Sequence, residues 1–203
     1  MSIKKIVKKN KTISNFAKNY FTRISEIFSK LNFKKIEKLE KILMKARKSK
    51  SNIFVFGNGG SAATASTMAN DLGFDIIKKT KTKIPFKFFA LTDNNPVITA
   101  ISNDVGYENV LINQLKIHHK KGDVTILISA SGNSKNLLNA AKWIKSNGGF
   151  VFSFLGFDGG KLKKISNEHI LVDSIKGEYG PVEDIHLMIN HILAHWFQEK
   201  IKK

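Results

Sequence analysis

The sequence predicts an α/β protein, with a parallel sheet covered by helices on both faces. Two observations predict this class. Several short apolar runs rich in β-branched and aromatic residues each end at Gly, Asp or Ser, as buried parallel strands do. Segments with the length and polarity pattern of helices separate these runs. A chain of 203 residues is most simply accommodated in one domain.

Five apolar runs are expected to form the strands, and four longer segments between and after them are expected to form helices. The expected strands are 53–56, 86–92, 124–129, 150–156 and 169–174. The expected helices are 61–72, about 96–119, 134–147 and 182–199. The predicted architecture is therefore a three-layer αβα arrangement around a five-stranded, mostly parallel sheet.

The first 50 residues form a basic, helical segment ahead of this α/β region. They hold 16 Lys and Arg against 3 Glu, and so carry most of the net charge of +18. Apolar residues recur in the segment at helical spacing: Ile24, Ile27, Phe28, Leu31, Ile36, Leu39, Ile42 and Leu43. We expect residues 1–50 to pack on the domain formed by 51–203, or on a neighbouring subunit, and the chain to be one structural unit.

Charge and composition indicate which binding partners and which cellular location the sequence favours. A basic segment is compatible with nucleic acid or an acidic membrane surface, but interleaved lysines also describe a solvated helical face, which we favour. The chain has no cysteine, no apolar stretch of membrane-spanning length and no signal-peptide pattern at its start. We therefore expect a cytoplasmic protein that is neither exported nor embedded in a membrane, with nucleic acid an unlikely partner.

Two turns between a strand and a helix are rich in Gly, Ser and Asn. They read "GNGGS" at 57–61 and "SASGNS" at 129–134. Exposed N–H groups at a helix start favour an anion, so two such turns on one rim of the sheet predict a small phosphorylated ligand. Taken alone, "GNGGS" is also compatible with a tight turn capped by Ser61. It lacks the dinucleotide and Walker patterns, so we expect no nucleotide cofactor.

Asp71 and His191 are the best candidates for an acid/base pair. Asp71 lies four residues after Thr67, so both share one helical face, while Glu183 and His191 lie about two turns apart on the last helix. We expect His186 and His195 to point elsewhere. A helical histidine can instead be a core or surface residue, so the pair is a hypothesis.

The motifs "GNGGSAA…ANDL", "LTDN", "SASGNS" and "YGPVEDIHLMINHIL" together resemble the sugar isomerase (SIS) fold, and specifically the phosphoheptose isomerase group. The resemblance covers about residues 50–198 in the same order. It implies a phosphosugar site between the subunits of a homotetramer. It also implies interconversion of sedoheptulose 7-phosphate and D-glycero-D-manno-heptose 7-phosphate, for surface-polysaccharide or nucleotide-sugar synthesis.

The resemblance also implies roles for individual residues. Asp71 falls on the catalytic carboxylate of the group and His191 on its catalytic histidine. Asp93 would contact sugar hydroxyls or organise the rim. The residues implied to hold the ligand, with the serines of "SASGNS" on the phosphate, are Asn58, Gly59, Ser61, Ser129, Ser131 and Ser134.

Three positions depart from the pattern of the group. Thr67 stands where a zinc-ligating His is typical, Asp71 where Glu is typical, and Ala130 replaces a hydroxyl residue. Threonine is a poor zinc ligand, so a zinc ion would depend on Glu183 and His191 with other partners. These changes affect catalysis more than fold or ligand class.

Two other functions remain open from the sequence. One is a catalytically silent phosphosugar-binding protein with a protein partner, such as a replication initiator, which Thr67 and the basic segment favour. The other is a nucleic-acid-binding module, supported only by charge. The aromatic residues of the basic segment are spaced like a packing stripe rather than like a surface on which bases stack; they are Phe16, Tyr20, Phe21 and Phe28.

Overall fold

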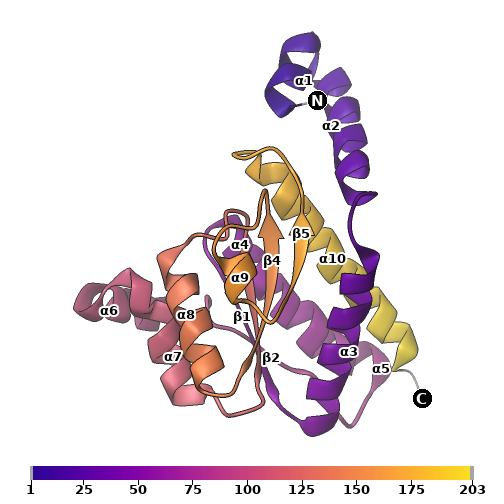
Figure 1. Ribbon diagram of the computed structural model, residues 1–203. Helices are drawn as coiled ribbons and strands as arrows, with labels where there is room; N and C mark the ends of the chain where they lie inside the picture. Colours follow the sequence, from indigo (N-terminus) through magenta and orange to yellow (C-terminus); the bar gives the residue numbers. More distant parts are fainter. Residues whose placement is uncertain (1, 202–203) are drawn as a thin grey trace.

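A five-stranded parallel sheet forms the centre of the protein. The computed structural model describes residues 2–201. The strands are β1 (Asn52–Gly57), β2 (Lys87–Ala90), β3 (Val124–Ser129), β4 (Phe150–Gly156) and β5 (Glu168–Val172). They lie in the order β2-β1-β3-β4-β5, and every neighbouring pair is parallel (Figure 1). The predicted α/β class and all five strands are confirmed.

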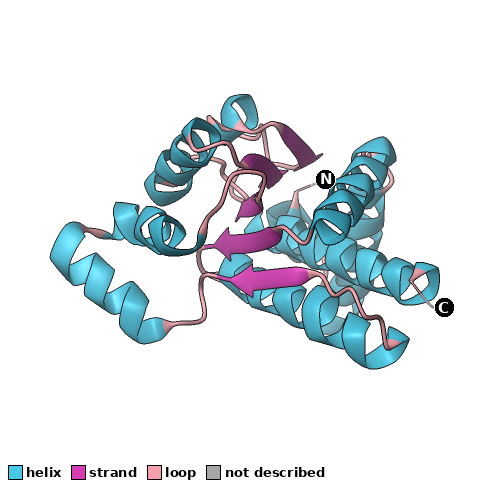
Figure 2. Ribbon diagram, turned by 90° about the horizontal axis from the view of Figure 1, so that it is seen from below, coloured by secondary structure: helices cyan, strands magenta, loops and turns pink. Residues whose placement is uncertain are grey.

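Helices cover both faces of this sheet, as Figure 2 shows. One layer contains α3 (Phe33–Ser49), α4 (Gly60–Met68), α5 (Asp75–Thr80) and α10 (Tyr179–Lys200). The opposite layer contains α7 (Val110–His118), α8 (Lys135–Ser146) and α9 (Leu162–Ile165), with α6 (Asn95–Val105) at its outer end. The three-layer αβα prediction is therefore confirmed.

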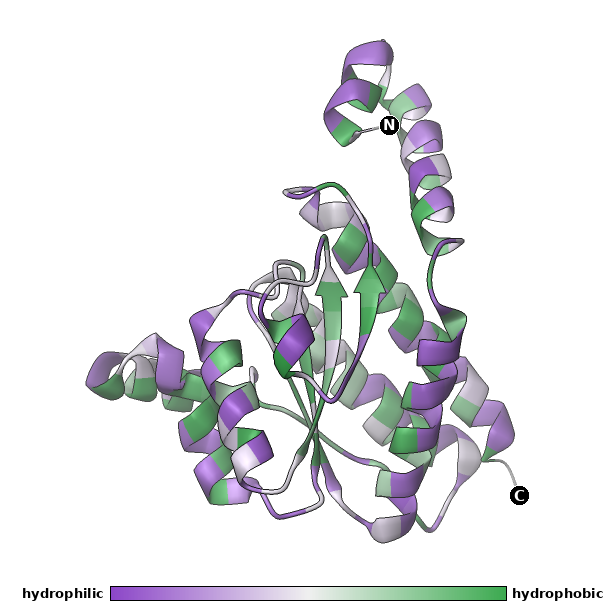
Figure 3. Ribbon diagram, in the orientation of Figure 1, coloured by the Kyte–Doolittle hydropathy of each residue, from purple (hydrophilic) through white to green (hydrophobic). Residues whose placement is uncertain are grey.

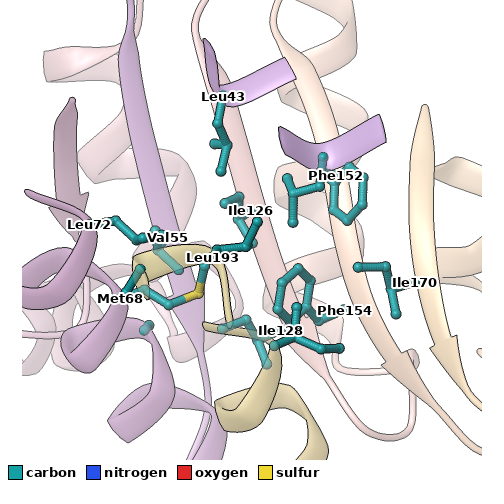
Figure 4. Close-up of a cluster of buried hydrophobic side chains, with 14 of the residues drawn as sticks. Leu43, Val55, Met68, Leu72, Ile126, Ile128, Phe152, Phe154, Ile170 and Leu193 are labelled. Atoms are coloured by element: carbon teal, nitrogen blue, oxygen red, sulfur yellow. The ribbon is translucent and has the colours of Figure 1, made fainter. Parts of the chain in front are cut away.

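Alternating side chains of the central strands supply the two cores. Val55 faces the layer of α4 and α10, whereas Phe54 and Phe56 face the layer of α7 and α8. Figure 4 shows the first core, where Val55, Ile126 and Phe154 meet side chains from the flanking helices. The strands carry apolar residues along most of their length (Figure 3), as strands covered on both faces require.

The N-terminal segment contains α1 (Ile3–Lys9) and α2 (Ile13–Phe28) ahead of α3. Its predicted apolar stripe is confirmed, since Ile24, Ile27, Leu31, Leu39 and Leu43 are buried and Phe28, Ile36 and Ile42 are partly buried against the same core. The helix α3 lies on the sheet, whereas α1 and the first part of α2 project beyond it (Figure 1) and are joined to the start of α10 by hydrogen bonds from Ile3 N to Glu178 and from the Tyr20 hydroxyl to Asp184.

Two predicted helices differ from the observed ones. The helix expected at 61–72 runs on to Thr80 through a π-helical turn, Ala69–Phe74, which separates α4 from α5. The helix expected at 96–119 is broken at Gly106, whose φ of 89° ends α6 before a 3₁₀ turn, Tyr107–Asn109, leads into α7. Only glycine adopts such a φ readily, so this break follows from the sequence.

The two edges of the sheet differ from its centre. β2 has four residues and an exposed Lys87. At the other edge, α3 packs beside β5, and Lys35 Nζ lies 2.7 Å from Glu168 Oε2, with Lys38 paired to the other oxygen. These lysines lower the pKa of Glu168. Within residues 2–201, no helix is long and apolar enough to cross a membrane.

Candidate active site

The carboxyl ends of β1 and β3 define the place where a ligand is expected. The chain leaves β1 toward β2 on one side and returns across the sheet to β3 on the other, so the strand order reverses between these two neighbours. Ligands of open parallel sheets bind at this point of reversal. The "GNGGS" turn follows β1 and the "SASGNS" turn follows β3, so the two turns predicted to bind an anion lie side by side.

Asn58 connects the two turns. Its Oδ1 accepts from Asn136 Nδ2 at 2.9 Å, while its own Nδ2 donates to Asn136 Oδ1 at 3.1 Å. The same Oδ1 accepts from the hydroxyl of Tyr107 at 2.8 Å. The amide of Asn58 therefore braces the start of α8 and the turn before α7, and most of its hydrogen-bonding capacity is used within the protein.

Glycines let the first turn pack closely against its neighbours. A Cβ at Gly57 would overlap Ser61, and one at Gly60 would overlap the carboxylate of Glu183 on α10. Ser61 itself is 4% exposed. Gly59 has a φ of 56° and is exposed, so its backbone faces the open side of the turn. The burial of Glu183, with the nearby charge of Asp184, raises the pKa of this carboxyl group.

The second turn is held by its backbone and by the side chains of Ser129 and Asn133. Asn133 Nδ2 donates to Ser131 O at 2.9 Å, and its Oδ1 accepts from Lys161 N at 3.1 Å. Gly132 has a φ of 61°, and a Cβ there would overlap the carbonyl oxygen of Gly159. Ser129 Oγ accepts from Gly132 N at 3.0 Å, and Leu162 N donates to Gly132 O at 2.9 Å. Ser131 Oγ accepts from Asn133 N at 3.3 Å, which leaves its hydroxyl proton available.

Ser134 occupies the N-cap position of α8, a helix of 12 residues. Within the described chain, its hydroxyl makes no capping hydrogen bond. Ser131 and Ser134 are both partly exposed, whereas Ser129 is buried. The turn thus presents two hydroxyl groups beside the first N–H groups of a helix, which is the arrangement that favours a phosphate.

Asp71 and His191 are brought together from distant parts of the sequence. Asp71 lies in the π-helical turn after α4, and His191 lies on α10, which runs alongside. Asp71 Oδ2 is 3.6 Å from His191 Nε2. The Asp71 side chain is 16% exposed and the His191 side chain 52% exposed. A carboxylate and an imidazole so placed can both reach one bound molecule.

The other predicted site residues lie apart from this pair. Asp93 follows β2, and its Oδ1 accepts from Thr92 Oγ1 at 3.2 Å and from the hydroxyl of Ser66 on α4. It lines a cavity of about 630 Å³ beside β2, whereas His191 lines a groove of about 1210 Å³ between α3 and α10. His195 also lines that groove. His186 is fully buried under β4, so neither of these histidines joins the pair.

The expected zinc ligands do not meet at one point. The hydroxyl of Thr67 donates to Ala63 O at 3.0 Å, Glu183 lies against Gly60, and His191 faces Asp71. Residues 2–201 contain no group of three or more His, Cys, Asp or Glu arranged to hold a metal ion. The donors of this chain therefore do not fit a zinc ion, which needs about four ligands.

Three contacts at the site were not predicted from the sequence. They involve Tyr107 and Asn136, which hold Asn58, and Asn190, whose Nδ2 donates to Asp71 Oδ2 at 2.7 Å. The sequence carries a signal for Asn190 only: it is a polar residue at a position where the spacing of α10 predicts an apolar one.

Comparisons with known proteins show the family of the chain. The family model described as "SIS domain" matches residues 18–156. A probable phosphoheptose isomerase of Thermoplasma acidophilum is 35% identical over 91% of this chain and 98% of its own length. The phosphoheptose isomerase of Aquifex aeolicus is 30% identical over 91% of this chain and 95% of its length.

Solved structures show the same fold. A phosphoheptose isomerase structure from Neisseria gonorrhoeae superposes with a TM-score of 0.79 at 24% identity, over 93% of this chain and 100% of that one. One from Francisella tularensis has a TM-score of 0.79 at 21% identity, over 93% and 99% of the two chains. The chain therefore belongs to the SIS domain family, in the group that contains these phosphoheptose isomerases.

Proposed function

We propose that this protein is a phosphoheptose isomerase, an aldose–ketose isomerase that interconverts sedoheptulose 7-phosphate and D-glycero-D-manno-heptose 7-phosphate. The observation that carries the proposal is the contact of Asp71 with His191, further along α10 from the two turns suited to a phosphate. The relatives named phosphoheptose isomerase support the same activity, since they match the chain over most of its length.

The reaction moves one proton between neighbouring carbons and needs no external oxidant or reductant. Asp71 takes the proton from C1 of the ketose as the C2 carbonyl oxygen gains a proton from His191, which gives an enediol. His191 then takes the proton from the hydroxyl on C1, and Asp71 returns its proton to C2, which gives the aldose. Each side chain ends in its starting state, as acid/base catalysis requires.

The phosphate is assigned to the second turn. Val182 on α10 packs against Gly156, whose N–H donates to Ala130 O in that turn at 3.1 Å, so α10 begins beside the phosphate site. His191 lies nine residues further along α10, about 13 Å at the rise of an α-helix. An extended seven-carbon sugar phosphate is shorter than this, and the side chains at the two ends of the site cover the difference. In this assignment Ser131 and Ser134 hold the phosphate, and Ser129, Asn58, Gly59, Ser61 and Asp93 shape or contact the rest of the ligand.

We assign the groove beside His191 to a second copy of the chain, within a homotetramer. Met188, Ile192 and Trp196 are 37%, 41% and 49% exposed and follow one another at four-residue spacing along α10. Exposed apolar stripes of this kind mark protein interfaces. A neighbouring subunit on this stripe would cover His191 and help close the site, and residues 1–50 would contribute α2 and α3 to the contact.

Conversion of sedoheptulose 7-phosphate in D₂O, followed by NMR, tests the activity. We expect aldose formation, with deuterium at C2 in the fraction of turnovers in which the proton on Asp71 exchanges with solvent before it returns, and losses of about 100-fold or more in kcat for Asp71→Asn and His191→Ala. Asp75→Asn and His118→Ala are matched controls, because they remove the same groups from exposed or ion-paired positions elsewhere. Absence of turnover with and without added zinc would contradict the proposal.

Mass measurement in solution tests the assembly. We expect a tetramer for the natural chain and smaller species for Ile192→Glu, because a charge on the stripe opposes apolar burial. Ile117→Glu is the control, since Ile117 is 74% exposed at the end of α7, away from the groove. A monomeric natural chain would contradict the assigned interface.

A further inference from the structure

Asn190 contacts the proposed base from the buried side of α10. Its Nδ2 donates to Asp71 Oδ2 at 2.7 Å, and that same oxygen lies 3.6 Å from His191 Nε2. Asn70 Nδ2 donates to the other oxygen at 3.0 Å. Asp71 is therefore bracketed by a buried amide on one side and an exposed imidazole on the other, from two consecutive residues of one helix.

The amide of Asn190 carries a cost to stability. The residue is fully buried, and across residues 2–201 its Oδ1 has no hydrogen-bond partner. Burying an unpaired carbonyl oxygen costs free energy that an apolar side chain of the same shape would avoid. The residues that follow on the same face of the helix, Leu193, Ala194 and Phe197, are apolar and buried, and His186, one turn earlier, is buried and polar like Asn190. Packing therefore does not explain an asparagine at this position.

The carboxylate of Asp71 needs an external constraint. The terminal torsion of aspartate has a broad, shallow preference, so the side chain does not by itself fix the direction of its two oxygens. Asp71 also lies in a π-helical turn, a feature that is frequent at functional sites. The backbone brings the residue to α10, where Asn70 holds Oδ1 from the same helix and Asn190 holds Oδ2 from across the contact.

We propose that Asn190 is a positioning residue for Asp71, which holds Oδ2 of the base toward His191 and the substrate. The inference rests on the proposed isomerase function. It assigns no contact between Asn190 and the sugar, so loss of the amide lowers the rate of proton transfer and leaves substrate binding unchanged. A misplaced base of this kind costs rate even when every reacting group is present.

Asn190→Leu tests the proposal, because leucine has a similar shape and lacks the amide. We expect kcat on sedoheptulose 7-phosphate to fall about 10- to 100-fold with KM within about twofold, and the melting temperature to change little, because the variant loses the hydrogen bond to Asp71 together with the unpaired Oδ1. Thr125→Val is the matched control. Thr125 is also fully buried with an unpartnered polar atom, but it lies on β3, away from Asp71, so kcat should not change.

A second variant and a second readout keep the test decisive. If Asn190→Leu does not fold, Asn190→Ala removes the amide without adding bulk, and the same split between kcat and KM is expected. NMR of the Asn190 side-chain amide reports the contact without substrate: its protons should exchange slowly in the natural chain and at least tenfold faster in Asp71→Ala.

The outcomes separate this inference from the proposed function. An unchanged kcat, or a rise in KM with kcat unchanged, overturns the positioning role. Equal exchange rates in the natural chain and Asp71→Ala overturn the contact itself. If the natural chain shows no isomerase activity while the exchange rates differ as expected, the proposed function fails and the contact stands.

Discussion

The two turns at the rim of the sheet are alike in sequence and are held in different ways. The first turn is held by side chains, since Asn58 bonds to Asn136 and Tyr107. The second is held by backbone and glycine contacts and by Asn133, whose Oδ1 accepts from Lys161 N after β4. Neither Ser131 nor Ser134 is used as a donor in these contacts, so both keep free hydroxyl protons. A turn whose side chains hold the scaffold has few donors left for a ligand, and this difference favours the second turn as the phosphate site.

The largest expected effect comes from the glycine that closes the second turn. In Gly132→Ala we expect the positive φ to lower the free energy of unfolding by about 1 to 2 kcal/mol. The overlap of the new Cβ with Gly159 should lower it by about 1 to 3 kcal/mol more. Chemical unfolding should show this loss, together with weaker substrate binding. Gly122→Ala is the control, since Gly122 has a φ of 92° with nothing near its Cβ position, and should show only the first cost. Equal losses would mean that the contact with Gly159 does not hold the turn.

His186 contacts the end of β4, next to the second turn. Its protonation should have the next largest effect on the free energy of unfolding. Its Nε2 lies 3.2 Å from Leu155 O, and burial lowers the pKa of His186 to about 4. The unfolded chain binds this proton near pH 6.5 and the folded chain does not, so the free energy of unfolding falls as pH falls from about 6.5 to 4, by roughly 3 kcal/mol.

Urea unfolding at pH 7, 6 and 5 measures that change, and His186→Gln should flatten the slope. Part of the slope should remain, because burial also lowers the pKa values of His119 and His169. If the free energy of unfolding depends on pH as steeply in His186→Gln as in the natural chain, protonation of His186 is not the cause of the dependence.

Removing one serine hydroxyl that is assigned to the phosphate should weaken substrate binding with little effect on the stability of the fold. In Ser134→Ala we expect KM for the sugar phosphate to rise about tenfold, the equivalent of about 1.4 kcal/mol, because one hydrogen bond to a charged group is lost. The free energy of unfolding should change by less than about 0.5 kcal/mol. Steady-state kinetics and urea unfolding separate the two effects. A stability loss with unchanged KM would assign Ser134 to the scaffold.

The smallest effect is expected at the first turn, where a substitution should lower stability and leave substrate binding unchanged, the opposite of Ser134→Ala. Tyr107→Phe removes the hydroxyl that donates to Asn58, which should lower the free energy of unfolding by about 1 kcal/mol. KM should stay within about twofold. If KM rises and stability does not change, Asn58 serves the ligand and the contrast between the two turns is lost.

The sequence predicted the strands well because each is a short apolar run buried on both faces, with a polar turn at its end. It predicted Asp71 and His191 from helical spacing and motif resemblance, and the structure brings them within 3.6 Å. The roles implied for Asn58 and the other rim residues stay predictions, because they depend on a ligand.

The features that were missed depend on tertiary contacts. The π-helical turn at Ala69–Phe74 arises where the helix after β1 packs along α10, and its residues carry no local pattern that distinguishes it from an α-helix. The break at Gly106 could have been predicted from the glycine. Asn190 could have been recognised as a polar residue on a buried face, but its partner Asp71 lies 119 residues away.

The two sheet edges bear on how copies of this chain can associate. An exposed edge strand invites pairing with another sheet, and natural proteins avoid this with short strands, lysines or a covering helix. Here β2 is short and carries Lys87, and β5 lies beside α3 with Glu168 engaged by Lys35 and Lys38. Both edges thus discourage strand-to-strand pairing, which leaves the helical surfaces as the faces through which copies of the chain can associate.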